Sequence, residues 1–102
     1  TVINQQTDQN SPEQFWLLAE VAFLNQDYEI AAENYAEVEN LNSSDVADSF
    51  RFHYAISLFQ TKQYDEAMRN VKICELNHYE PRKVKQLYKQ IQRERSKKLR
   101  AG

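Results

Sequence analysis

Glycine and cysteine are almost absent from this sequence of 102 residues. The only glycine is Gly102, which excludes a glycine-rich phosphate loop, a nucleophile elbow and a glycine-punctuated hairpin. The only cysteine is Cys74, so an internal disulfide framework and a cysteine-based zinc cluster are also excluded. No segment approaches the run of about 18 apolar residues that a membrane-spanning helix needs.

The residues that are present are sufficient for a folded core. Apolar residues make up 41% of the sequence and aromatic residues 12%, which argues against a wholly disordered chain. The length fits one small domain, or two or three shorter repeats. Because the sequence begins at Thr1 and not at a methionine, we expect a processed product or a part of a longer protein.

The charged residues are distributed unevenly. Residues 1–80 contain 14 acidic and four basic residues, whereas residues 81–102 contain nine basic residues and the single acid Glu94. The net charge of -2 therefore hides an acidic body and a basic C-terminal tail. Such a tail can contact nucleic acid, an anionic membrane surface or an acidic protein face, or it can be the solvated surface of a terminal helix.

Apolar residues recur at intervals of three and four residues, which predicts an all-α fold. The sequence contains no strand-like alternation of apolar and polar residues. The expected helices cover about residues 12–25, 28–41, 45–61 and 64–77, and a fifth begins at Pro81. Residues 1–10 are polar, lack helical spacing and are expected to form a flexible arm.

Several expectations concern the individual helices. Ser11 with Pro12 gives the first helix a strong start, and Ser43 or Ser44 is expected to cap the third. The apolar residues of the first helix extend too far around it for a one-sided surface helix, so we expect two of its faces to be occupied. Beyond Ile91 the fifth helix has few apolar residues, and its end is expected to fray.

Two short segments are near copies of each other. Residues 26–31 (Gln-Asp-Tyr-Glu-Ile-Ala) and 62–67 (Lys-Gln-Tyr-Asp-Glu-Ala) lie 36 residues apart, each at a predicted junction between helices. The junction and its spacing resemble the tetratricopeptide repeat, whose unit is two antiparallel helices of about 34 residues. The small residues that let paired helices approach closely would be Ala19, Ala31, Ala55 and Ala67.

The resemblance implies antiparallel helix pairs stacked as a short superhelix with a C-terminal capping helix. It divides the sequence into an arm (1–10), a first repeat (11–42), a second repeat (43–78) and a basic capping helix with its tail (79–102). The sequence also departs from the family pattern, because it lacks the family's glycine and closing proline and has Arg51 where a tryptophan is usual.

In arrays of this family, the first helix of each repeat lines a concave groove where partners bind. The inward positions would be, in the first repeat, Glu13, Trp16, Glu20, Phe23 and Leu24 and, in the second, Ser49, Phe52, Ile56, Phe59 and Gln60. This set is mostly apolar, and an exposed apolar patch usually marks an interface. The resemblance therefore implies a non-catalytic adaptor or scaffold that binds a peptide or an amphipathic helix of another protein.

Alternatives remain open for these residues and for the basic tail. Further repeats of a longer parent, or the arm with its Val2 and Ile3, could cover the groove. Lys85, Lys89 and Arg93 could contact nucleic acid or an anionic membrane surface, although basic residues alone are non-specific. The unfilled groove and the oppositely charged ends also allow a homo-oligomer.

Catalysis and cofactor binding have little support in the sequence. His53 and His78 are the only histidines, and neither has a nucleophile and an orienting carboxylate placed with it. Cys74 and His78 could form one side of a metal site, but a second pair is missing and Cys74 fits a core position. We therefore expect no enzyme activity, no cofactor and no metal. The lone cysteine and the expected fold favour a cytoplasmic or other intracellular location.

Overall fold

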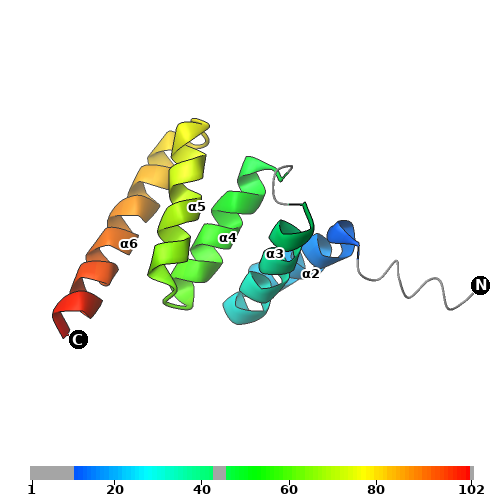
Figure 1. Ribbon diagram of the computed structural model, residues 1–102, viewed down its shortest axis with the longest axis horizontal. Helices are drawn as coiled ribbons and strands as arrows, with labels where there is room; N and C mark the ends of the chain where they lie inside the picture. Colours follow the sequence, from blue (N-terminus) through cyan, green and yellow to red (C-terminus); the bar gives the residue numbers. More distant parts are fainter. Residues whose placement is uncertain (1–10, 43–45, 102) are drawn as a thin grey trace, which may run out of the picture. The chain divides into compact units, whose positions relative to one another are not determined.

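The computed structural model describes residues 11–42 and 46–101, and the predicted arm lies outside these ranges (Figure 1). Five helices make up this part of the chain: α2 (Pro12–Leu24), α3 (Tyr28–Asn42), α4 (Asp48–Gln60), α5 (Tyr64–Leu76) and α6 (Pro81–Ala101). No strand occurs within the described ranges. The predicted all-α fold class is therefore confirmed.

The helices belong to two compact units. The first unit, Thr1–Val46, contains α2 packed against α3. The second unit, Ala47–Gly102, contains α4 packed against α5 and α5 packed against α6. Within each unit, short turns join successive helices that lie side by side (Figure 1). Each unit thus contains one complete helix pair, and the second unit has an additional helix.

The four alanines expected where paired helices approach closely are all fully buried. Ala19 and Ala31 in the first unit and Ala55 and Ala67 in the second are 0% exposed. Larger side chains fill the space around these methyl groups, as close packing requires. The largest fully buried side chains include Tyr35, Phe50, Ile91, Val38 and Val71.

The same turn ends α2, α4 and α5. After each helix one residue adopts a left-handed backbone: Gln26 (φ 65°), Lys62 (φ 66°) and His78 (φ 58°). At the end of α4, the N–H of Lys62 donates to the carbonyl of Phe59 at 3.0 Å, and the next N–H donates to the carbonyl of Leu58 at 2.8 Å. Equivalent pairs of bonds end α2 and α5, and this pattern is the Schellman motif.

Replacing Lys62 with glycine is expected to stabilise the second unit. Glycine usually occupies this left-handed position because it has no Cβ to clash with the backbone. Lys62 is exposed, so Lys62→Gly should raise the free energy of unfolding by about 0.5–1 kcal/mol. Urea denaturation followed by circular dichroism measures the change. Lys62→Ala is the control, since it keeps a Cβ, and a similar gain in that variant would contradict the explanation.

One of the two expected N-terminal caps is confirmed and the other is wrong. Ser11 accepts a hydrogen bond from the backbone N–H of Gln14 at 3.4 Å, and Pro12 occupies the first turn of α2. The N-cap of α4 is Ala47, which makes no side-chain capping bond. Asp48 places a negative charge in the first turn instead, which favours a helix start there. Ser43 and Ser44 lie outside the described residues, and the third helix begins at Asp48, later than these serines had suggested.

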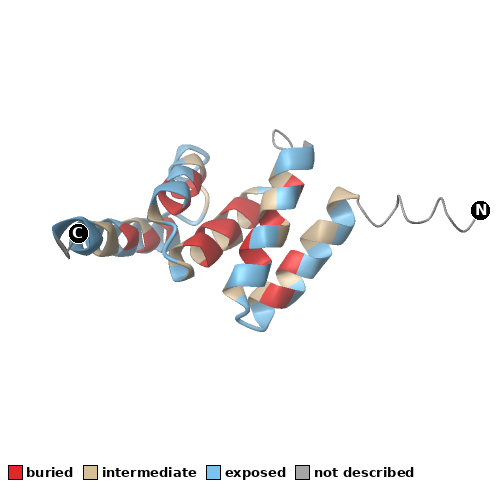
Figure 2. Cartoon of the chain, turned by 60° about the horizontal axis from the view of Figure 1, so that its bottom comes forward, coloured by how far each residue is buried: buried red, intermediate tan, exposed pale blue. Residues whose placement is uncertain are grey.

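The expected fraying beyond Ile91 is also wrong, because α6 continues to Ala101. Arg95 Nη1 lies 3.4 Å from Asp65 Oδ1, and Lys98 Nζ lies 5.7 Å from the centre of the Tyr64 ring. These contacts connect the polar end of α6 to the start of α5. Exposed residues, pale blue in Figure 2, nevertheless predominate along α6.

Candidate functional site

Phe52, Ile56 and Phe59 line one shallow depression on the second unit. They follow one another at four and three residues along α4, each is half-buried, and residues of α6 complete a hollow of about 250 Å³. The centre of the Phe52 ring lies 5.8 Å from that of Tyr79, and the centre of the Phe59 ring lies 5.9 Å from that of Tyr64. These contacts fix both phenylalanine rings and leave part of each exposed.

Trp16, Glu20 and Phe23 have the same spacing on α2 and are also half-buried. Glu20 Oε2 accepts two hydrogen bonds, from Trp16 Nε1 at 3.3 Å and from the Tyr35 hydroxyl at 2.6 Å. Burial of Tyr35, together with its bond to Glu20, raises the pKa of the Tyr35 hydroxyl far above its ordinary value. Glu20 therefore holds the Trp16 ring within the first unit, a structural role that the sequence analysis did not identify.

The side of α2 opposite Ala19 and Ala22 carries apolar residues that are exposed. Leu17, Val21 and Leu24 lie one turn apart, and these residues and Leu18 are between 49% and 77% exposed. The expectation that two faces of this helix are occupied is therefore wrong for the part of the chain that the structure describes. Burial follows the side of the helix that packs on α3, where Ala19 and Ala22 lie.

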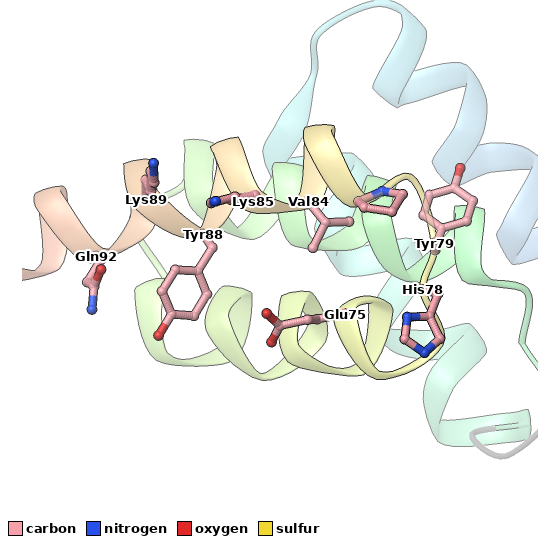
Figure 3. Close-up of a pocket in the computed structure, with 9 residues that line it drawn as sticks. Glu75, His78, Tyr79, Val84, Lys85, Tyr88, Lys89 and Gln92 are labelled. Carbon is pink, nitrogen blue, oxygen red and sulfur yellow. The ribbon is translucent and has the colours of Figure 1, made fainter.

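The three predicted basic contact residues all lie on α6 and are exposed. Lys85 and Lys89 line a pocket of about 600 Å³ that sequence reasoning missed. Figure 3 shows it between α5 and α6, with Tyr88 and Glu75 reaching into the space between the helices. Arg93 does not line this pocket. The sequence feature that could have indicated this pocket is a pair of tyrosines, Tyr79 before the start of α6 and Tyr88 after it.

The residues considered for metal binding have a structural explanation. Cys74 is fully buried, and its Sγ lies 3.8 Å from the carbonyl oxygen of Asp48. Burial raises the pKa of the Cys74 thiol to about 11, so the thiol is protonated at neutral pH. Within the described ranges, no group of three or more histidine, cysteine, aspartate or glutamate residues could hold a metal ion.

None of the described helices combines the length and apolar character needed to cross a membrane.

Arg51 lies where the family usually has a tryptophan, and it forms a buried polar pair with Asn70. The Arg51 side chain is almost completely buried, and its Nη1 donates to Oδ1 of the fully buried Asn70 at 2.9 Å. Asn70 Nδ2 in turn donates to the backbone carbonyl of Glu66 at 3.0 Å. This pair connects α4 to α5, and the sequence analysis recognised only its first member as a departure from the repeat pattern.

Comparison with known families adds to this geometry. Residues 3–74 match the family model of the anaphase-promoting complex, cyclosome, subunit 3, which is a tetratricopeptide-type repeat family. The chain belongs to this family. The subunit 3 family match covers more than half of the chain, includes α2 and α4, and confirms the resemblance that the repeated junctions suggested.

Repeats of the type found in the subunit 3 family generally bind other proteins and are generally non-catalytic. The matched residues end before α6 begins at Pro81. No curated protein and no solved structure matched the chain.

Proposed function

We propose that this chain is an adaptor module that binds a peptide or an amphipathic helix of a partner protein through the first helix of each repeat, α2 and α4. The observation that carries the proposal is the depression formed with Phe52, Ile56 and Phe59. Apolar side chains at i, i+4 and i+7 are the pattern by which grooves and amphipathic helices recognise each other.

The positions of these side chains suit binding. Each apolar anchor contributes roughly 1–3 kcal/mol when a partner covers it fully. The contacts of Phe52 with Tyr79 and of Phe59 with Tyr64 hold the rings before a partner arrives. Because fewer rotamers are lost on binding, less of the interaction energy is offset by entropy. On α2, the Trp16–Glu20 hydrogen bond restricts the indole in the same way.

Family membership also supports this proposal. The family is named after subunit 3 of the anaphase-promoting complex, so the name itself refers to a multi-subunit assembly. We infer that this chain likewise acts inside an assembly, where its apolar surfaces contact other proteins. The partner contributes an apolar side chain to the depression on α4.

The double variant Phe52→Arg plus Phe59→Arg is expected to lose its partner. Two buried cations in an apolar contact would each be desolvated without compensation, so recovery should fall by at least about tenfold. The measurement is affinity capture from a lysate of the source cell with the wild-type chain and the variant, followed by direct titration of the purified partner. Circular dichroism verifies that the variant remains helical.

Leu76→Arg plus Leu99→Arg is the matched control, because it makes the same chemical change at two exposed leucines of the second unit. The control variant should retain the partner. Equal loss of the partner in both variants would contradict the proposal, as would a partner whose affinity does not change when Phe52 and Phe59 are replaced. Sedimentation of the wild-type chain alone reveals whether the chain self-associates.

A further inference from the structure

The nine basic residues of α6 separate into two groups. Four have a partner within the second unit: Lys83 with Glu80, Arg95 with Asp65, Lys97 with Glu94, and Lys98 over the Tyr64 ring. The remaining five are exposed, and no side-chain hydrogen bond or ion pair engages them in the part of the chain that the structure describes: Arg82, Lys85, Lys89, Arg93 and Arg100.

The five unengaged residues lie on one side of α6. At 3.6 residues per turn they fall within an arc of about 80° and extend over about 27 Å of the helix axis. The four engaged residues lie outside this arc. No acidic residue lies inside it, since Glu94, the only acid of α6, lies on another side of the helix. We call these five residues the basic face.

The pocket between α5 and α6 adjoins the basic face, because Lys85 and Lys89 belong to both. Its other lining residues include Tyr79, Pro81 and Tyr88, which offer apolar and aromatic surface (Figure 3). Its volume of about 600 Å³ is large enough for one aromatic side chain. A cationic surface therefore borders directly on a place for an apolar anchor.

We propose that the basic face and this pocket together bind an acidic segment of a partner protein, with carboxylates on Lys85, Lys89 and Arg93 and one aromatic or large apolar side chain in the pocket beside Tyr88. The site uses other residues than the apolar depression on α4 and does not depend on the proposed function. Charge complementarity supplies the orientation, and the pocket supplies the short-range contact.

Nucleic acid and lipid fit the same surface less well. Residues 1–80 carry 14 acidic against four basic residues, so a long polyanion would be repelled by most of the chain. Glu75 lines the pocket and would oppose a phosphate there, whereas an apolar side chain avoids this repulsion. The basic face carries no apolar side chain that could insert between lipids, which interfacial helices use for binding.

Fluorescence anisotropy with a labelled synthetic peptide tests the proposal. The peptide is N-acetylated and C-amidated, carries glutamate at every fourth position, and has one phenylalanine three positions after the first glutamate. The wild-type chain should bind it, and the affinity should fall as the salt concentration rises. Lys85→Glu plus Lys89→Glu should weaken binding by at least about tenfold. Replacing the phenylalanine of the peptide with alanine should weaken binding several-fold.

Two further variants make the result specific. Lys62→Glu plus Lys83→Glu makes the same change in net charge at two residues outside the basic face and should weaken binding clearly less than Lys85→Glu plus Lys89→Glu does. Glu75→Gln removes the opposing carboxylate from the pocket and should tighten binding about two- to threefold, which a poorly folded variant could not do. Absence of peptide binding would overturn the proposal. So would equal weakening by the control, or tighter binding of a single-stranded oligonucleotide or of phosphatidylserine vesicles than of the peptide.

Discussion

The Asn70→Leu variant is expected to lose about 2–4 kcal/mol of unfolding free energy in the second unit. Leucine has the same number of side-chain heavy atoms as asparagine but no amide. The buried guanidinium of Arg51 would therefore lose the acceptor that now lies 2.9 Å from its Nη1. The backbone carbonyl of Glu66 would also lose its bond from Asn70. Urea denaturation of the whole chain, followed by circular dichroism, measures the loss.

The matched control replaces both members of the pair. Arg51→Met plus Asn70→Leu removes the buried cation together with its acceptor, so it should be more stable than Asn70→Leu alone. Asn70→Asp, which keeps an acceptor oxygen, should also cost less than Asn70→Leu. If Asn70→Leu changes the unfolding free energy by less than about 0.5 kcal/mol, the Arg51–Asn70 hydrogen bond contributes little to stability.

In the first unit, Tyr35→Ala is expected to cost about 3–5 kcal/mol. Tyr35 is completely buried, so its removal leaves a cavity among the side chains that connect α2 and α3. The variant also removes the shorter of the two hydrogen bonds that Glu20 accepts. The ultraviolet emission of Trp16, whose indole bonds to the same carboxylate oxygen, reports on the unfolding of this unit during a urea titration.

Tyr35→Phe separates the contribution of the ring from that of the hydroxyl. It keeps the ring and removes the hydroxyl that donates to Glu20, so a loss of about 1–2 kcal/mol is expected. The Trp16 emission of the folded variant should also change, because the carboxylate oxygen that accepts from the indole then loses its bond from Tyr35. A loss in Tyr35→Phe as large as that in Tyr35→Ala would show that the hydroxyl, and not the cavity, dominates.

The helical repeat could be predicted from the sequence because it depends on short-range regularities. The spacing between Gln26 and Lys62 marked two copies of one turn, and the alanines at 19, 31, 55 and 67 marked the close approaches. These features depend on residue size and backbone geometry, which are local. The apolar set on α4 was predicted from the inward positions that the family resemblance implies, and the structure places Phe52, Ile56 and Phe59 in one depression.

The features that the sequence analysis missed depend on contacts between distant residues. The order of the end of α6 arises from Arg95 and Lys98 meeting residues about 30 positions earlier. The bond between Arg51 and Asn70 and the one between Tyr35 and Glu20 connect different helices in the same way. A periodic apolar pattern contains no information about such polar pairs. The pocket beside Tyr88 also requires the packing of α5 against α6, which sequence spacing alone does not give.

The absence of lysine and arginine before Arg51 has a practical consequence for proteolysis. Trypsin, which cuts after these two residues, finds no site in the first unit, and its earliest site is the buried Arg51. The exposed sites are concentrated on α6. Partial digestion of the folded chain therefore shortens it from the C-terminal side while α2 and α3 remain in one intact fragment. Mass spectrometry of the fragments at successive digestion times would show the order in which the sites of the second unit become accessible.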